Sequence, residues 1–563
     1  MENKGYTLMQ KRKSAVREAL IAALDGAWNE GSLPVCAIPD FAIEQPKDAG
    51  HGDFAANLAM LLAKETKMVP RVIAAALAAQ VDCSGLLIKE CQVAGPGFLN
   101  FFFKENWLQQ VFAEIVELGE DFGKSMTGVG KKVQVEFVSA NPTGELHMGN
   151  ARGAAIGDTL ANLLSMSGYE VEREFYINDA GNQIEKFGYS LEARYLQLLG
   201  QDVEFPDDGY HGEDITRTMQ QLVDEQGNKF LEKESELRRE LLIEYALEKK
   251  IGAIKKALAD FGVRYDVWFS EQSLHDSGEI VRVLSRLRDA DYLYEKEGAT
   301  WLACTRFGEE KDEVLVRTNG LPTYFAVDIA YHDNKFQRGF DTVINIWGAD
   351  HHGHVARMKG AMETLGYDRA RLEILLMQFV RLIKDGEVVK MSKRSGTYVT
   401  LEELIEEIGV DAARFFFVMR SADSLLDVDM DLALSESSDN PVYYVQYAHA
   451  RICSILANAK EQGYLLGAAP DCRLLDHESE LQLIRKLADF PDEISFGASM
   501  REPHRLAAYV QELAAQFHNF YNHCRVLGED RELSVARLWL AWTVAFTIKK
   551  GLSLMGVSAP EKM

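Results

Sequence analysis

The stretch from Val133 to Leu164 constrains the fold of this chain more than any other. It begins with a short apolar run rich in valine, which predicts a β-strand. It ends with isoleucine and leucine residues at helical spacing, which predict an α-helix. The segment 141–144, which contains a proline and a glycine, separates the two. The stretch therefore predicts a strand, a tight connection and a helix.

The junction between this strand and helix holds His147, Gly149 and Asn150. A polyphosphate bound here would meet unpaired backbone N–H groups and the positive end of the helix dipole. Gly149 lets the backbone approach closely, and the ring of His147 offers a hydrogen-bond donor. A lone H-x-G pattern is also typical of an ordinary turn with a surface histidine, so the nucleotide interpretation needs a second element.

Composition limits which partners such a site can have. The chain has 563 residues and a hydrophobic content of 47%, which predicts roughly two to four globular domains. Its net charge of −25 and sequence pI of about 5.0 should repel nucleic acids and anionic membranes on average. A polyanionic partner therefore requires a local basic patch.

Cysteine spacing and hydropathy indicate a cytoplasmic protein. The seven cysteines are an odd number and no two have C-x-x-C spacing, so neither a disulfide framework nor a cysteine zinc site is predicted. No apolar run of about 18 residues occurs, and the N-terminus lacks the apolar core of a signal peptide. We expect no membrane partner.

The first residues predict a small α+β module that ends near residue 118. Residues from about 8 to 25 carry apolar side chains on one helical face, and residues 94–101 indicate a turn followed by a strand. Between them, the polar segment 44–53 leads into a helix that Asp53 is expected to cap.

Beyond the opening stretch, the alternation of strands and helices continues, stops and returns. Val171–Ile177 predicts the next strand, and polar residues 178–182 follow it, as ligand-binding groups do at strand ends in open α/β sheets. From about 185 to 300, charge-rich helical segments dominate, which predicts an insertion between two halves of a nucleotide-binding fold. The alternation returns between Val314 and Trp347.

Polar residues follow the strand that ends at Trp347, namely Asp350, His351, His352 and His354. A zinc site is disfavoured because adjacent histidines point to different sides of most backbones, and no H-E-x-x-H motif or cysteine partner accompanies them. We expect no structural metal. The cluster is interpreted as strand-end groups that face the nucleotide crevice.

Tyr324 and Asp328 are four residues apart and would share a face if their segment is helical. A carboxylate beside a phenol hydroxyl supplies charge-assisted hydrogen-bond acceptors for a cationic side chain. An ordinary exposed aspartate near a core tyrosine fits the same spacing, so the sequence leaves both interpretations open.

The second element needed for the nucleotide interpretation is the segment Lys390-Met391-Ser392-Lys393-Arg394-Ser395-Gly396. It provides the local basic patch, because the stretch from Arg381 to Tyr398 contains five cationic residues and only two acidic ones. A cationic loop of this kind could close over a triphosphate and stabilise charge on a departing pyrophosphate. After residue 440 the chain is helical to its end, with apolar stripes typical of a bundle core.

Taken together, the segments His147-Met148-Gly149-Asn150 and Lys390–Arg394 resemble the two motifs of class I aminoacyl-tRNA synthetases. Other segments resemble the arginyl-tRNA synthetase family in particular: Ser139-Ala140-Asn141-Pro142, Arg152-Gly153, residues 44–55 and 94–101, the helix VYYVQYAHARI, and Pro560–Met563. The resemblance covers nearly the whole chain.

This resemblance implies an α/β fold with a Rossmann-type parallel sheet, an N-terminal α+β domain and a C-terminal all-α bundle. Residues 1–118 would contact the tRNA elbow. Residues 119–434 would form the catalytic domain, including the insertion at about 185–300 and stem-contacting helices at about 400–434. Residues 435–563 would bind the anticodon.

The resemblance also implies roles for individual residues. His147, Lys390 and Lys393 would be catalytic. ATP would be bound by His147, Gly149, Asn150, Lys390, Met391, Ser392 and Lys393. Arginine would be bound by Ser139, Asn141, Tyr324 and Asp328, with Glu136 and Asp350 as weaker candidates. The first motif departs from the family's usual pattern, since Asn150 stands where a second histidine is common; an amide can still donate to ATP.

The implied reaction is in-line attack of the arginine carboxylate on the α-phosphorus of MgATP, followed by transfer of arginine to the terminal ribose of tRNA(Arg). Positioning and stabilisation of phosphate charge should dominate its catalysis. The family favours a monomer. The alternatives are a class I synthetase for another amino acid, a nucleotidyltransferase, which is normally much shorter, and a non-catalytic synthetase-like RNA-binding protein.

Overall fold

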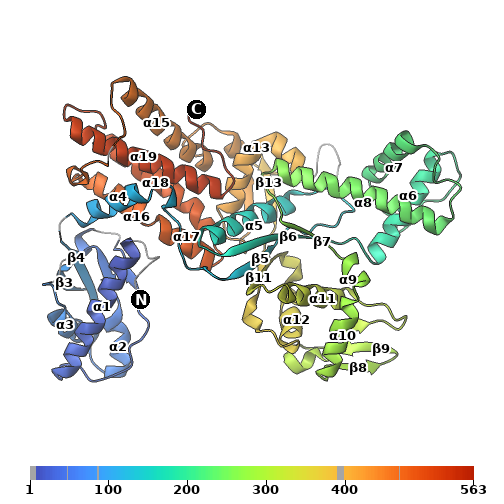
Figure 1. The fold of residues 1–563 in the computed structure, drawn as a ribbon, viewed down its shortest axis with the longest axis horizontal. Helices are drawn as coiled ribbons and strands as arrows, with labels where there is room; N and C mark the ends of the chain where they lie inside the picture. The colour runs from blue at the N-terminus through green and yellow to red at the C-terminus, as the bar shows by residue number, and fades with distance from the viewer. Residues whose placement is uncertain (1–7, 47–48, 85–87, 105, 390–398, 468) are drawn as a thin grey trace.

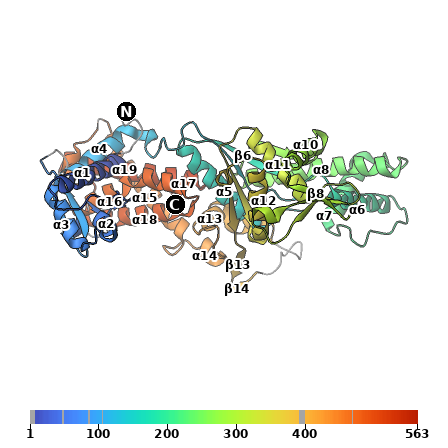
Figure 2. The same cartoon turned by 90° about the horizontal axis from the view of Figure 1, so that it is seen from below.

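The computed structural model describes residues 8–46, 49–84, 88–104, 106–389, 399–467 and 469–563. Four parts follow one another along an elongated molecule, with an N-terminal lobe and a helical insertion at opposite ends (Figures 1 and 2). A parallel sheet lies between them. A helical bundle formed by the C-terminal residues packs beside the sheet and the N-terminal lobe.

The N-terminal lobe is a four-stranded antiparallel sheet in the order β1-β2-β4-β3, covered by helices. Its elements are α1 (Leu8–Asn29), β1 (Ile43–Glu44), β2 (Phe54–Ala56), α2 (Leu58–Thr66), α3 (Pro70–Gln80), β3 (Ile88–Ala94), β4 (Phe98–Phe103) and α4 (Trp107–Leu118). The α+β prediction is confirmed here.

The predicted cap at Asp53 is wrong. Strand β2 follows Asp53, and α2 starts only at Leu58. The Asp53 carboxylate instead accepts a hydrogen bond from the backbone N–H of Phe103 at 2.8 Å and pairs with Arg485 of the C-terminal bundle at 3.0 Å. Sequence spacing suggested a local cap, whereas the side chain serves a contact between distant segments.

The central sheet has five parallel strands in the order β12-β11-β5-β6-β7, which is the strand order of a Rossmann-type fold. Its strands are β5 (Lys132–Glu136), β6 (Glu170–Ile177), β7 (Val267–Ser270), β11 (Thr342–Gly348) and β12 (Leu372–Met377). The predicted fold class is confirmed. Chain order reverses between β5 and β11, so the carboxyl ends of these strands form the crevice in which ligands bind in such sheets.

Helices cover both faces of this sheet because its strands alternate apolar side chains between two cores. Helix α5 (Met148–Met166) packs in the larger core together with Val133 and Val135 of β5. The opposite face packs against α9 (Gln272–Asp276), α10 (Glu279–Asp289), α11 (Tyr324–Gln337) and α12 (His352–Thr364). A small antiparallel sheet extends this layer through β8 (Leu293–Lys296), β9 (Ala299–Leu302) and β10 (Glu313–Val316).

The charge-rich insertion forms a separate lobe with its own core. It consists of α6 (Asn182–Leu198), α7 (Glu213–Gln226) and α8 (Ser235–Asp260). The expected range of about 185–300 also contains β7, which pairs with β6 in the central sheet. Four-residue strands such as β7 give a weak sequence pattern, which explains why the alternation was not visible there.

The remaining elements lead from the sheet into the bundle. They are β13 (Val380–Lys384), β14 (Glu387–Val388), α13 (Leu401–Val418), β15 (Leu426–Asp429) and α14 (Met430–Leu434). The bundle contains α15 (Pro441–Glu461), α16 (Glu478–Ala488), α17 (Phe490–Ser499), α18 (His504–His523) and α19 (Arg531–Leu554). No helix in the described part of the chain has the length and apolarity needed to cross a membrane.

Candidate active site

The N-terminus of α5 is closed by a reciprocal pair of hydrogen bonds. Nδ1 of His147 accepts from the backbone N–H of Gly149 at 3.1 Å, and Oδ1 of Asn150 accepts from the backbone N–H of His147 at 3.0 Å. His147 and Asn150 therefore form a capping box. The side-chain amide of Asn150 thus helps to cap α5, which is a structural role that an asparagine can fill at this position.

The capping bond also fixes the protonation pattern of His147. The surrounding protein lowers the pKa of its exposed ring by partial desolvation, which favours the neutral imidazole at neutral pH. Because Nδ1 accepts a hydrogen bond, the single ring proton of that neutral form lies on Nε2. The helix N-terminus thus presents a neutral N–H donor beside its backbone N–H groups.

The same turn is paired with the segment that follows the predicted basic loop. The backbone N–H of Met148 donates to Val399 at 3.3 Å, and that of Leu401 donates to Leu146 at 2.8 Å. The predicted residues Lys390, Met391, Ser392 and Lys393 lie outside the described residues. The chain that follows them therefore runs directly beside the N-terminus of α5.

Strand β5 ends in a backbone conformation that side chains rarely adopt, with φ of +70° at Val138 and +41° at Ser139. The hydroxyl of the partly buried Tyr265 donates to the carbonyl of Phe137 at 3.0 Å and supports this bend. Ser139 Oγ donates to Glu136 at 2.8 Å and accepts from the backbone N–H of Tyr176 at 3.1 Å. The bend thereby joins the carboxyl ends of β5 and β6.

The segment that carries Tyr324 and Asp328 is helical, so both residues lie on successive turns at the start of α11. Thr323 caps this helix by accepting from the backbone N–H of Ala326. Oδ2 of Asp328 lies 3.2 Å from Nε2 of His354 on α12. The side chain of Tyr324 is exposed.

Glu271 is a second carboxylate of this site, and it was missed in the sequence. It follows β7 and is only 3% exposed. The hydroxyl of Tyr176 donates to it at 2.9 Å. Burial, aided by the charges of Asp328 and Asp179 and opposed by the hydrogen bond from Tyr176, raises the pKa of Glu271 to about 7. Its sequence signal is a polar residue directly after a strand, the same signal that singled out residues 178–182.

Two acidic groups thus converge at the carboxyl ends of the strands. Tyr324 also lies within electrostatic reach of Glu271. We call Ser139, Tyr176, Glu271, Tyr324 and Asp328 the candidate pocket. A pocket with two carboxylates and phenol hydroxyls, next to a helix N-terminus, suits a cationic side chain beside a phosphate.

Comparisons with known proteins match this architecture along the whole chain. The arginyl-tRNA synthetase N-terminal domain matches residues 10–103, the catalytic domain of class I (R) tRNA synthetases matches 114–452, and the DALR anticodon binding domain matches 445–563. The arginine–tRNA ligase of Heliobacterium modesticaldum is 59% identical over 97% of this chain and 98% of its own length. That of Moorella thermoacetica is 56% identical over 99% and 100%.

The chain belongs to the arginyl-tRNA synthetase family. The structure of the Thermus thermophilus arginyl-tRNA synthetase has the same fold, with a TM-score of 0.74, 24% identity and coverage of 98% of this chain and 100% of its own. The resemblance found in the sequence is confirmed. The protein is therefore a class I aminoacyl-tRNA ligase, and its family uses ATP.

The other predicted pocket residues of this synthetase have contacts of their own. Both oxygens of Glu136 are occupied, one by Ser139 and the other by the buried Lys335 at 2.5 Å. Asn141 donates to Gln183 of α6 at 3.1 Å. Asp350 is exposed and lies 3.7 Å from His351. Glu136 and Asp350 are thus placed differently from Asp328, one beneath the pocket and one at the surface.

The histidines after β11 do not form a metal cluster in the synthetase. His354 faces Asp328, and the rings of His351 and His354 both lie near Trp347. Among all described residues, no group of three or more histidine, cysteine and acidic side chains is arranged to hold a metal ion.

The C-terminal bundle of the synthetase has an open cleft of about 540 Å³ that aromatic side chains line. Its lining residues are Ser438, Tyr443, Tyr444, Tyr447, Arg451, His518, Tyr521 and Asn522. The rings of Tyr443 and Tyr447 are stacked, and the guanidinium of Arg451 lies 4.5 Å from the centre of the Tyr521 ring. Flat aromatic faces beside a cation suit unpaired nucleobases.

Proposed function

We propose that this synthetase activates L-arginine with ATP and transfers it to tRNA(Arg), and that the candidate pocket binds the arginine side chain. The observation that carries this proposal is that Glu271, directly after β7, lies within electrostatic reach of Asp328 on α11. A guanidinium has five N–H donors in a planar fork, and two carboxylates can accept them with full charge assistance. The names of the close relatives support the same substrate.

Roles within the pocket follow from the surroundings of each residue. Asp328 and Glu271 pair with the guanidinium, and Tyr324 closes the mouth of the pocket. Ser139 and Asn141 lie near the strand ends, where they bind the amino acid end of the substrate. Glu136 acts from beneath through Ser139, because its second oxygen is held by Lys335. Asp350 is the weakest candidate because it is solvent-exposed.

ATP is bound at the N-terminus of α5. The Nε2–H group of His147 donates to a phosphate, Gly149 supplies backbone room, and Asn150 holds the turn. The loop residues Lys390, Met391, Ser392 and Lys393 close over the triphosphate, and both lysines stabilise the charge of the pyrophosphate as it leaves. Magnesium enters as part of the MgATP substrate, since Mg²⁺ is commonly held through phosphate oxygens.

The protein contributes positioning rather than covalent chemistry to the reaction. The arginine carboxylate attacks the α-phosphorus, the bond to the pyrophosphate breaks, and arginyl-adenylate forms. The terminal ribose hydroxyl of the tRNA then attacks the activated carbonyl, and AMP leaves. His147, Lys390 and Lys393 touch the reacting phosphates and are the catalytic residues of this proposal.

The tRNA is bound along the elongated molecule. We assign residues 1–118 to its elbow, the helices at about 400–434 to its stem and the bundle of 435–563 to its anticodon. The aromatic cleft supports the last assignment, because base stacking tolerates an acidic protein surface when a local cation such as Arg451 is present. We propose that the enzyme acts as a monomer in the cytoplasm.

ATP–pyrophosphate exchange with the purified full-length chain tests this function. We expect exchange with arginine, dependent on tRNA, and none with lysine, cysteine or glutamine. Exchange with another amino acid would contradict the arginine assignment. Complete inactivity with all four amino acids, in the presence of tRNA, would favour a non-catalytic RNA-binding protein.

A further inference from the structure

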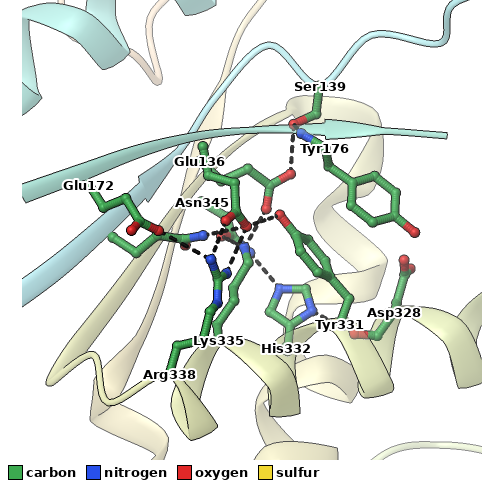
Figure 3. A network of polar contacts seen from close by, with 12 residues as sticks. Glu136, Ser139, Glu172, Tyr176, Asp328, Tyr331, His332, Lys335, Arg338 and Asn345 are labelled. Carbon is green, nitrogen blue, oxygen red and sulfur yellow. Dashed lines mark hydrogen bonds and ion pairs between the residues drawn. The ribbon is translucent and has the colours of Figure 1, made fainter. Parts of the chain in front are cut away.

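A chain of buried polar side chains runs beneath the candidate pocket, with Lys335 at its centre (Figure 3). Lys335 Nζ donates to Glu136 at 2.5 Å and to Oδ1 of Asn345 at 2.9 Å. Nδ2 of Asn345 lies 2.6 Å from Nε2 of His332, and Nδ1 of His332 lies 2.7 Å from the backbone carbonyl of Asp328. The chain therefore connects Glu136 at the end of β5 with the turn of α11 that carries Asp328.

The hydrogen bonds of this chain have only one possible direction. A lysine ammonium has donors only, so the Asn345 oxygen must accept and its nitrogen must donate to His332. At the other end, the carbonyl of Asp328 can only accept, so Nδ1 of His332 carries the ring proton. Both ends require the same tautomer of His332. The ammonium of Lys335 thus sets the orientation of every group as far as Asp328.

These groups are withdrawn from water. The side chain of Lys335 is 0% exposed, and Asn345 and His332 are also buried. Burial, followed by the charge of Lys335, holds the pKa of the His332 imidazole well below its usual value. A neutral His332 adds no positive charge beneath a site that receives a guanidinium. The buried chain therefore leaves Glu271 and Asp328 as the charged groups that face the substrate.

We propose that Lys335 is a positioning residue for arginine recognition, because it neutralises Glu136 and orients Asn345 and His332 against the turn of α11 that carries Asp328. Lys335 does not touch the substrate. It acts through Glu136 on Ser139, and through Asn345 and His332 on Asp328, so it supports both sides of the pocket. The inference rests on the proposed function of the candidate pocket.

The first test is the variant Lys335→Met in the full-length enzyme, assayed with arginine, ATP and tRNA. We expect the KM for arginine to rise at least about tenfold, because a displaced Asp328 loses directed contacts with the guanidinium. The KM for ATP should change little, since α5 does not contact this chain through any of the hydrogen bonds described above. The unfolding temperature should also fall, because the buried Glu136 loses its ion-pair partner.

Two further variants separate positioning from simple structural support. The double variant Glu136→Gln with Lys335→Met removes both charges, so it avoids an unpaired buried ion. Asn345→Leu keeps the Lys335–Glu136 pair and removes both hydrogen bonds of Asn345, the one from Lys335 and the one to His332. A merely structural role predicts a normal arginine KM in both variants. Positioning predicts that both keep a raised arginine KM while their KM for ATP stays normal.

Lys250→Met is the matched control. Lys250 is also a nearly buried lysine, paired with Asp214 in the insertion lobe. Its loss should lower the unfolding temperature without changing the ratio of the arginine KM to the ATP KM.

The wild-type enzyme must first be shown to charge tRNA with arginine. That assay tests the proposed function separately from the positioning role of Lys335. The positioning proposal is overturned if the double variant and Asn345→Leu both keep an arginine KM within about twofold of wild type. It is also overturned if the arginine and ATP KM values rise together. Failure of both variants to fold would overturn it as well. The buried hydrogen bonds from Lys335 to Asp328 would then be needed for the sheet to fold rather than for the pocket to bind arginine.

Discussion

At the scale of residues, the pocket combines two carboxylates in different surroundings. Asp328 is partly exposed and lies 3.2 Å from His354, whereas Glu271 is buried and hydrogen-bonded to Tyr176. The pKa of Glu271 is raised to about 7, so this carboxyl is close to the point of losing its charge at neutral pH. Asp328 and Glu271 therefore lead to different predictions.

Replacing Asp328 with asparagine removes the charge but keeps the shape of the side chain. We expect the KM for arginine to rise about 10- to 100-fold, because a charge-assisted hydrogen bond to the guanidinium is lost. Steady-state aminoacylation with varied arginine and saturating ATP measures the change. Asp350→Asn is the control, since its exposed side chain should contribute little. Equal effects of the two substitutions would remove Asp328 from the pocket.

Glu271 predicts a pH dependence of arginine use. Below pH 7 the raised pKa keeps this carboxyl protonated and neutral, and above pH 7 it becomes the carboxylate that a guanidinium requires. The value of kcat/KM for arginine should therefore fall about tenfold for each pH unit below the pKa and reach a plateau above it. Glu271→Gln should give a low and flat profile. A wild-type profile that is level between pH 6 and pH 8 would contradict the assignment.

At the scale of elements, the N-terminus of α5 has two separable properties. The ring of His147 accepts the capping hydrogen bond through Nδ1, and its Nε2–H is the group that we propose donates to ATP. An asparagine at position 147 can replace the cap but presents no ring donor at the same place, whereas an alanine replaces neither.

We expect His147→Asn to keep the wild-type unfolding temperature and His147→Ala to lose about 1 kcal/mol of stability with the cap. Both should reduce kcat of pyrophosphate exchange by about 10- to 1000-fold, because each lacks the donor to the phosphates. Differential scanning calorimetry and exchange kinetics on the same samples measure the two effects. Near-normal kcat in His147→Asn would show that the ring serves only as a cap.

The sequence predicted elements well where one segment contains all the information. The strand, turn and helix of residues 133–164, and the strand at Val171–Ile177, were visible because apolar spacing is a local property. The sequence did not show whether the Tyr324–Asp328 segment is helical. The structure shows that it is. Local patterns also misled once, at Asp53, whose partners lie on β4 and in the bundle.

The missed groups all depend on contacts between distant segments. Glu271, Tyr176 and Lys335 meet other pocket residues only because the strands of the sheet are ordered as they are. No spacing in the sequence brings Lys335 to Glu136, which lies 199 residues earlier. A buried ammonium surrounded by fixed acceptors is a tertiary property, and sequence patterns carry no direct signal for it.

At the scale of the whole molecule, Arg414 connects parts that are distant in sequence. Its fully buried guanidinium donates to Asp158 of α5 at 2.5 Å, to the carbonyl of Phe261 after α8 at 3.1 Å and to that of Met555 after α19 at 2.6 Å. It thereby joins the sheet layer, the end of the insertion and the last helix of the bundle. Gly556 packs so closely that an added Cβ would lie 2.4 Å from the guanidinium.

We expect Arg414→Met to destabilise the protein by about 3–5 kcal/mol, because Asp158 and two carbonyls lose their partner in a dry interior. Arg381→Met is the matched control. Arg381 makes a two-pronged pair with Asp427 at 2.7 and 2.8 Å, but both side chains are about half exposed, so its loss should change the stability far less. Thermal unfolding of both variants at one protein concentration compares them. Arg414 links the end of the bundle with α5, the helix that starts at the proposed ATP site. Its loss should therefore also reduce tRNA charging more than Arg381→Met does. Equal unfolding temperatures for the two variants would mean that the bundle and the sheet are held together by apolar packing alone.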